Sequence, residues 1–302
     1  MTETLEFETW DVFTDQRFAG NPLAVVFDAD RLSAASLLAI TREFNYSESV
    51  FVLQSDVPGC HARIRIFTPA GELPFAGHPT VGAACAIARR DSIDQSMRLE
   101  LDAGIFPIRL GPRPTSKHAA RLAEFENPNL PRLTGTGPVA GQVEAALSLP
   151  AGSVATGAGS PARASAGIEF IYARASLEHV RRASLEPGAW NALEIGDACG
   201  LLLYAEGGDS AESHFHARMF GPHIGVPEDP ATGSAAAALP AHVLTAAALP
   251  DGPHQWLVEQ GFEMGRPSQI RVAFELRAGE FQALRVSGQA VPVLRGTLSL
   301  SD

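Results

Sequence analysis

The chain has 302 residues, of which 45% are hydrophobic and 19% are charged, as in globular proteins that bury a sizeable apolar core. Its formal net charge of −11 argues against nucleic-acid binding, because an acidic surface repels a phosphate backbone. The apolar runs are far too short to span a membrane, and the acidic first residues do not resemble a secretion signal. We therefore expect a cytoplasmic protein without a membrane or nucleic-acid partner.

Lysine and cysteine usage argues against several kinds of chemistry. Lys117 is the only lysine and lies in a polar segment, which argues against Schiff-base and pyridoxal-phosphate enzymes. The three cysteines, Cys60, Cys85 and Cys199, are far apart and form no Cys-x-x-Cys pair. We therefore expect neither a disulfide framework nor a zinc knuckle from them.

The first predicted elements are a hairpin and a helix. Residues 5–13 alternate polar and apolar side chains, and the apolar run 23–27 follows a Gly-Asn-Pro turn, so these segments predict two paired strands. Residues 33–45 predict an amphipathic helix that is capped by Ser33 and ends near Asn45.

Glu48 begins the next predicted strand, just before the apolar run 50–53. A carboxyl group at the start of an apolar strand can be partly desolvated, which raises its pKa toward the range useful for proton transfer. A glutamate at a strand start is more often a solvated surface residue, so the pattern alone leaves both interpretations open.

An internal repeat organises the chain. Residues 61–84 align without a gap with residues 214–237, an offset of 153 positions, and both copies contain the spacing Arg-x-Phe-x-Pro. Each copy predicts a strand, a Pro-rich loop and a helix of small apolar residues. The repeat predicts a duplicated domain, with a boundary near residues 111–135 and a flexible loop at 151–167.

The two predicted helices, at 80–88 and 234–244, are dominated by Ala and other small apolar residues and carry few charges, so we expect both to be buried. The start of a buried helix carries unpaired N–H groups and a partial positive charge, which together favour an anion. The loops before these helices carry titratable residues: Glu72, His78, Glu228 and Asp229. We interpret Glu72 and Glu228 as turn residues. His78 and Asp229 become site candidates because we expect them to occupy matching positions of the duplicated loop.

Several motifs, distributed over the whole chain, resemble the PhzF-like branch of the diaminopimelate-epimerase superfamily. They include Phe18-Ala-Gly-Asn-Pro, Ser47-Glu-Ser-Val-Phe, Phe75-Ala-Gly-His-Pro-Thr and Glu228-Asp-Pro-Ala-Thr-Gly-Ser. The resemblance implies an α+β fold of two pseudo-symmetric lobes, each a curled sheet around a central buried helix. It implies an N-terminal lobe at 1–118, to which a strand at 287–302 returns, a second lobe at 119–286, and a homodimer.

The resemblance also implies a reaction, an isomerisation by proton shift on a small carboxylate-bearing substrate, as in phenazine biosynthesis. In this branch a single glutamate moves the proton, and Glu48 takes that place. By the same resemblance His78, Asp229 and Ser234 complete the catalytic set, and Gly77, Thr232 and Gly233 bind the substrate. The resemblance implies no metal and no organic cofactor. The epimerases of the superfamily place a cysteine at the start of each central helix, which this chain lacks.

Other readings stay open beside this one. The resemblance places the site in a cleft between the two lobes. A non-catalytic binding or interaction protein could also have such a cleft, as could an epimerase that works without cysteine. A hydrolase triad of Ser234, His78 and Asp229 is disfavoured, because no Gly-x-Ser-x-Gly motif surrounds the serine. His214, His216 and His223 could bind a metal, but a solvated or interfacial strand face is the plainer expectation for them.

Overall fold

The computed structural model describes residues 4–116 and 118–300, so Lys117 lies outside the described residues. The chain divides into two compact units, which we call unit 1 (Met1–Glu126 with Ser287–Asp302) and unit 2 (Asn127–Val286). Unit 1 includes β8 (Arg121–Glu126), which follows the boundary expected at residue 118. No helix among the described residues is long and apolar enough to cross a membrane.

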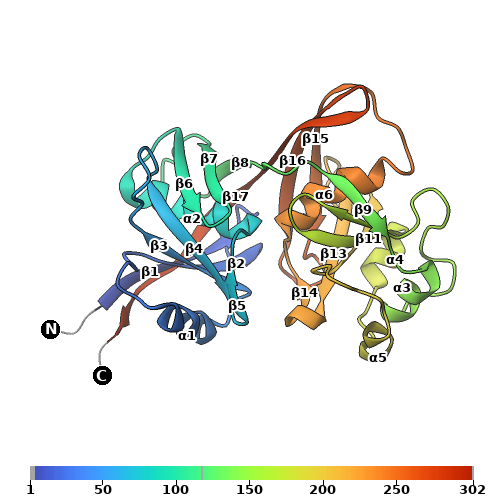
Figure 1. The fold of residues 1–302 in the computed structure, drawn as a ribbon, viewed down its shortest axis with the longest axis horizontal. Helices are drawn as coiled ribbons and strands as arrows, with labels where there is room; N and C mark the ends of the chain where they lie inside the picture. The colour runs from blue at the N-terminus through green and yellow to red at the C-terminus, as the bar shows by residue number, and fades with distance from the viewer. Residues whose placement is uncertain (1–3, 117, 301–302) are drawn as a thin grey trace. The chain divides into compact units, whose positions relative to one another are not determined.

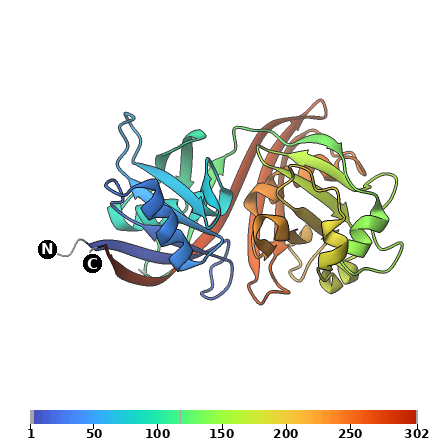
Figure 2. The same cartoon turned by 60° about the horizontal axis from the view of Figure 1, so that its bottom comes forward.

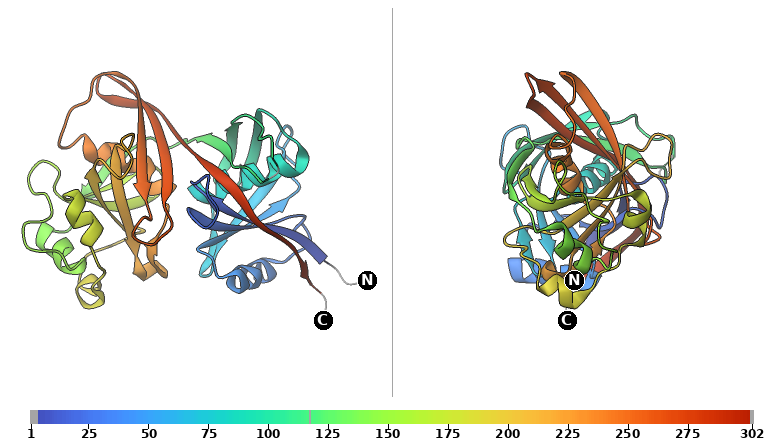
Figure 3. Two further views of the ribbon diagram at one scale, coloured as in Figure 1. Left: turned by 180° about the vertical axis from the view of Figure 1, so that it is seen from behind. Right: turned by 90° about the vertical axis from the view of Figure 1, so that its right-hand side faces the viewer.

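Unit 1 is built from eight strands, two helices and the end of a long last strand (Figure 1). The elements are β1 (Thr4–Val12), β2 (Asn21–Val26), α1 (Ala34–Phe44), β3 (Glu48–Leu53), β4 (Ala62–Thr68), β5 (Gly71–Leu73), α2 (Gly77–Asp91), β6 (Ser96–Leu101), β7 (Gly104–Leu110) and β8. The predicted hairpin is confirmed, because β1 and β2 pair antiparallel. The last strand, β17 (Glu280–Ser299), pairs antiparallel with β1 from Thr4↔Ser299 to Val12↔Ala290 (Figure 3).

The helix predicted at 33–45 forms with the expected caps. The Ser33 hydroxyl accepts a hydrogen bond from the backbone N–H of Ser36, and Asn45 ends the helix at φ 53°. α1 packs against β3 and β4 through a buried face that includes Leu37 (Figure 2). The two predicted capping residues, Ser33 and Asn45, therefore determine where α1 begins and ends.

α2 is the buried helix of unit 1. All residues from Gly77 to Ala88 are buried, and the helix contacts β1, β2, β3 and β8. A Cβ added at Gly82 would come within 2.5 Å of Leu23 Cδ2 and 2.7 Å of Val12 Cγ2. The small residues of α2 are therefore required by the close approach of the surrounding strands.

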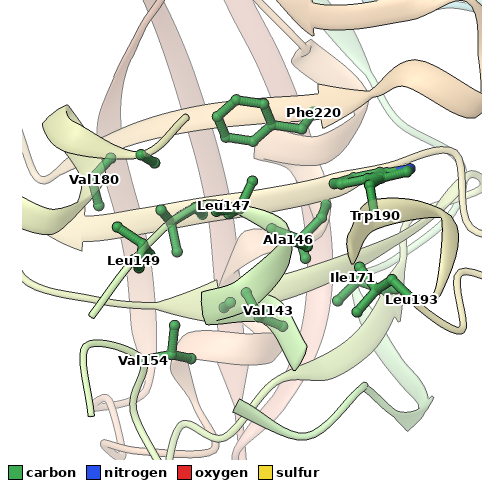
Figure 4. Packing of buried hydrophobic residues seen from close by; sticks show 14 of the residues in the cluster. Val143, Ala146, Leu147, Leu149, Val154, Ile171, Val180, Trp190, Leu193 and Phe220 are labelled. Atoms are coloured by element: carbon green, nitrogen blue, oxygen red, sulfur yellow. The ribbon is translucent and has the colours of Figure 1, made fainter. Parts of the chain in front are cut away.

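Unit 2 contains β9 (Arg132–Thr136), α3 (Ala140–Ala146), β10 (Ala162–Ser165), β11 (Glu169–Arg174), α4 (Leu177–Arg182), α5 (Pro187–Asn191), β12 (Leu201–Glu206), β13 (Phe215–Gly221), the 3₁₀ turn η1 (Pro222–Ile224), β14 (Val226–Asp229), α6 (Gly233–Val243), β15 (Gly252–Gln260), β16 (Ser268–Arg277) and the start of β17. An apolar core joins α3, α4 and α5 to the strands and includes Trp190 and Phe220 (Figure 4). The segment 151–167, expected as a flexible loop, contains β10, which pairs with β9 and β11. The boundary region 111–135 likewise contains β8 and the start of β9.

The two units repeat one topology. In unit 1, β2 pairs parallel with β3, β3 antiparallel with β4, and β4 parallel with β6. In unit 2, β11 pairs parallel with β12, β12 antiparallel with β13, and β13 parallel with β15. α6 is buried like α2 and contacts β9, β10, β11 and β16.

Matching side-chain contacts extend the repeat. Arg65 pairs with Glu72 and lies 5.1 Å from the Phe67 ring centroid, and Arg218 pairs with Glu228 and lies 5.0 Å from that of Phe220. His61 Nδ1 accepts from the N–H of Arg98, and His214 Nδ1 accepts from that of Leu257, at 3.1 and 3.2 Å. The predicted duplication is thus present in hydrogen bonds as well as in sequence.

The gap-free alignment is wrong in one respect, because the offset changes inside the Pro-rich loop. β4 and β13 differ by 153 positions, but the first residues of α2 and α6, Gly77 and Gly233, differ by 156. The extra residues of the second copy fall in η1. His78 and Asp229 are therefore not equivalent positions: His78 is the second residue of α2, and its counterpart in α6 is Ser234.

Candidate active site

Glu48 and His78 lie together in unit 1. Glu48 is the first residue of β3, opposite Leu23 of β2, and His78 is in the first turn of α2. Oε2 of Glu48 is 3.6 Å from Nε2 of His78, and the two side chains are 17% and 5% exposed. This Glu48 oxygen is buried and makes no hydrogen bond with the residues that the structure describes. A carboxyl oxygen and an imidazole nitrogen thus lie close together in a largely buried site.

Two further polar residues hold this pair in place. Asn21 is fully buried, and its Nδ2 lies 3.4 Å from His78 Nδ1. The Ser47 hydroxyl donates to Asn21 Oδ1 at 3.3 Å. Because an amide nitrogen can only donate, the contact with Asn21 makes His78 Nδ1 the acceptor and leaves the proton on Nε2, which faces Glu48. The imidazole can therefore stabilise the Glu48 carboxylate or donate to a bound group.

Burial raises the pKa of Glu48 from 4.5 to about 7, and the neighbouring Ser47 hydroxyl opposes part of this rise. Burial disfavours the charged carboxylate because the site offers little solvation for it. A carboxyl group that titrates near neutral pH can both accept and return a proton, which is the property that acid–base catalysis requires.

The raised pKa has a consequence for stability. The unfolded chain loses the Glu48 proton near pH 4.5 and the folded chain keeps it until about pH 7, so folding stability due to this group falls between these values. Glu48→Gln mimics the neutral acid, and we expect it to be more stable than the wild type at pH 8, by on the order of 2–3 kcal/mol. Urea unfolding at pH 4.5 and pH 8 measures this. A Glu48→Gln effect that is the same at both pH values would contradict the buried, raised-pKa carboxyl group.

Asp229 and Thr232 belong to a second network, in unit 2. The Thr232 hydroxyl donates to Asp229 Oδ2 at 2.5 Å, and both residues are buried. Gln260, fully buried at the end of β15, donates to the Asp229 carbonyl at 2.7 Å and accepts from the Thr232 N–H at 3.2 Å. The network fixes the loop that leads into α6.

The remaining predicted residues lie at the starts of the two buried helices. Gly77 is the first residue of α2, and the N-cap, Ala76, has only a methyl side chain. Gly233 and the half-buried Ser234 begin α6, whose N-cap, Thr232, donates its hydroxyl to Asp229. Neither cap side chain therefore satisfies the first-turn N–H groups, which keeps them suited to a carboxylate.

Sequence reasoning did not assign Asn21, Ser47 or Gln260 to the site. Asn21 is the one polar residue of the apolar strand β2, and this exception is the signal that could have found it. Gln260 follows Glu259 in a strand with several polar residues, so no such signal marks it.

The alternative metal set of three histidines does not form. His214 Nδ1 accepts from the Leu257 N–H, and His223 Nε2 contacts the Ala198 carbonyl at 2.9 Å. Of the expected solvated or interfacial strand face, the solvated alternative is wrong for His216, because its side chain is 0% exposed. The interpretation of Glu72 and Glu228 as turn residues is wrong, because they lie in β5 and β14 and form bidentate pairs with Arg65 and Arg218.

Known proteins resemble this chain in sequence over nearly its whole length. The model of the phenazine biosynthesis-like protein family, PhzC-PhzF, matches residues 10–296. The chain belongs to this family. An uncharacterized isomerase of Mesorhizobium japonicum is 40% identical to it, over 98% of this chain and 99% of the relative. The trans-2,3-dihydro-3-hydroxyanthranilate isomerase of Pseudomonas aeruginosa is 34% identical, over 95% of this chain and 96% of the relative. The expectation of an isomerase of this family is confirmed.

Solved structures of other proteins share the fold of this chain. A PhzF-family protein of Bacillus anthracis aligns with a TM-score of 0.87 at 24% identity, covering 99% of this chain and all of that one. A hydroxyproline epimerase from Agrobacterium vitis aligns with a TM-score of 0.61 at 13% identity, covering 100% of this chain and 95% of that one. The expected diaminopimelate-epimerase-like fold is confirmed.

Proposed function

We propose that this PhzF-family isomerase shifts a proton between two carbons of a small carboxylate-bearing substrate, with Glu48 as the group that carries the proton. The observation that supports this proposal is the buried Glu48–His78 pair, with the pKa of Glu48 near 7. As a carboxylate, Glu48 accepts a proton from a carbon next to a double bond. The resulting acid returns that proton further along the conjugated system.

The unit repeat supports a single acid rather than two. Ser49 pairs with Phe67 in unit 1, and Leu201 pairs with the equivalent Phe220 in unit 2. The residue before Leu201, the counterpart of Glu48, is Gly200, where an added Cβ would lie 2.6 Å from Met219 Sδ. A racemase that works from two faces needs two proton carriers, and the repeat supplies a carboxyl group at this position in one unit only. This asymmetry favours transfer on one face of the substrate.

Neighbouring residues have supporting roles in the proposal. The N–H on His78 Nε2 stabilises negative charge on Glu48 or on the substrate, and Asn21 and Ser47 hold the imidazole orientation. Asp229 and Ser234 enter through the family resemblance as residues that position the substrate, with Gly77, Thr232 and Gly233 as binding residues. A proton shift of this kind needs no metal or organic cofactor, because a matched acid and a stabilised enolate are sufficient.

The first substrate to test is trans-2,3-dihydro-3-hydroxyanthranilate, which the Pseudomonas aeruginosa relative isomerises by name. We expect turnover in deuterium oxide to place deuterium on a substrate carbon, detected by mass spectrometry and NMR. We also expect kcat/KM to rise through about pH 7, because the base must be ionised in the free enzyme. Binding of this compound without exchange or isomerisation would instead favour the non-catalytic alternative.

A further inference from the structure

A cluster of acidic residues surrounds His216 in unit 2 and contains none of the residues assigned to the reaction. His216 lies on β13 and Glu259 on β15, two strands that pair in parallel with these residues opposite each other. His216 Nδ1 is 3.6 Å from Glu259 Oε2 and 3.8 Å from Asp209 Oδ2. One ligand atom from each of the three residues lies within 4.8 Å of the other two.

The His216 ring lies inside this cluster, with one of its two nitrogens left without a hydrogen bond to the described residues. Its side chain is 0% exposed, and Nδ1 has no hydrogen-bond partner among the described residues. Its other nitrogen, Nε2, lies 2.8 Å from Glu263 Oε1. A metal-binding histidine usually donates its other ring N–H to a carboxylate, because this contact holds the proton there and directs the free lone pair at the ion.

The charges of the cluster are unbalanced. Asp209 is paired with Arg181, and Glu228 with Arg218, at 2.8 Å in both cases. Glu259 has a 1% exposed side chain and accepts the backbone N–H groups of Asp209 and Ser210. Glu263 lies 3.9 Å from Arg218, the arginine already paired with Glu228, and 2.8 Å from His216. Among these residues four carboxylates therefore face two arginines, an excess of two carboxylates that one divalent cation bound to a neutral His216 would neutralise.

The loop between β12 and β13 is shaped to bring Asp209 to this point. A Cβ added at Gly208 would lie 2.3 Å from Glu259 Oε2 and 2.5 Å from Ser213 Oγ, so a larger residue there would force these two side chains to move. The Asp209 side chain is 47% exposed, which opens the cluster to solvent on one side. An ion could therefore enter, and a water molecule could supply a further ligand.

From these contacts we propose that His216 Nδ1, Glu259 and Asp209 form a structural site for a divalent transition-metal ion, with Zn²⁺ as the best match. One imidazole and two carboxylates are ligands that zinc accepts, and ligands at its usual bond lengths lie roughly 3.3–3.6 Å apart in tetrahedral geometry. The two separations from His216 Nδ1, 3.6 and 3.8 Å, need only a small contraction, and the ligand oxygens of Asp209 and Glu259 lie within 4.8 Å of each other. The bound ion would tie the loop before β13 to β15.

Equilibrium dialysis of the untagged full-length chain against Zn²⁺, with metal measured by mass spectrometry, tests this site. We expect one tightly bound ion per chain and a higher midpoint of thermal unfolding with zinc. Asp209→Asn should weaken binding at least 10-fold, and Glu263→Gln about 10–100-fold through loss of the carboxylate that contacts His216 Nε2. His118→Gln, which changes an exposed histidine in unit 1, should leave binding unchanged.

A change at the buried His216 could prevent folding, so Asp209→Asn is the variant that tests the site. Asp209 is substantially exposed, and we expect this variant to fold. Equal zinc binding by the wild type and Asp209→Asn would overturn the proposal, as would an equal loss in His118→Gln. Absence of zinc binding by the wild type would also overturn it and would assign the cluster to a protonated His216. None of these readouts depends on isomerase activity.

Discussion

Glu48→Gln is expected to lower deuterium exchange and isomerisation by about 10²–10⁴-fold, the usual contribution of a positioned acid–base group. Glutamine keeps the size and hydrogen-bonding shape of the side chain but cannot carry a proton. Because burial disfavours the charged form of Glu48, replacing it with neutral glutamine should not destabilise the folded protein. We therefore expect the variant to lose activity while its free energy of unfolding stays equal or rises. Single-turnover exchange measured by mass spectrometry, together with urea unfolding, gives both quantities.

Three variants separate chemistry from packing at this position. Glu48→Asp keeps the carboxyl group but withdraws it by one methylene, so we expect partial activity. His78→Gln should lower the rate and change its pH dependence, because the group 3.6 Å from the Glu48 carboxyl is lost. Glu43→Gln alters an exposed glutamate of α1 and should have no effect. Exchange in Glu48→Gln at the wild-type rate would show that another residue carries the proton.

Arg218→Met is expected to destabilise the protein by about 3–5 kcal/mol, because it breaks a buried ion pair and leaves its partners without a donor. The Arg218 side chain is 8% exposed and forms two hydrogen bonds with Glu228 at 2.8 Å. Its Nη1 also donates to the carbonyls of Ala183 and Val180, at 2.5 and 3.2 Å, near the end of α4. Methionine fills similar volume but satisfies none of these acceptors.

The internal repeat supplies a matched control for this variant. Arg65 makes the same bidentate pair with Glu72, but its side chain is 19% exposed and its partner 28%. Because water can replace the lost hydrogen bonds there, Arg65→Met should cost about 1 kcal/mol or less. Chemical denaturation of both variants compares the two costs. Equal losses would mean that burial of Arg218 does not set its contribution.

The sequence alone was enough for features that depend on local order along the chain. The helix α1 followed from Ser33 and Asn45, because both caps act within one turn. The duplication followed from the Arg-x-Phe-x-Pro spacing, since each copy must place the same side chains on the same strand face. Burial of α2 and α6 followed from their small residues, because a helix without a polar face needs protein on all sides.

Features that depend on partners distant in the chain appeared only in the tertiary structure. The raised pKa of Glu48 arises from burial at the start of β3 beside β2 and α2, and a glutamate at a strand start is otherwise solvated. The burial of His216 likewise depends on the strand pairing of β13 with β15, which no local pattern encodes. The shift of three positions before α6 is hidden in composition, because the loop that contains η1 and its counterpart in the first copy are both rich in Gly and Pro. Local spacing determined which residues share a face of one element, and folding determined the solvation and charge around them.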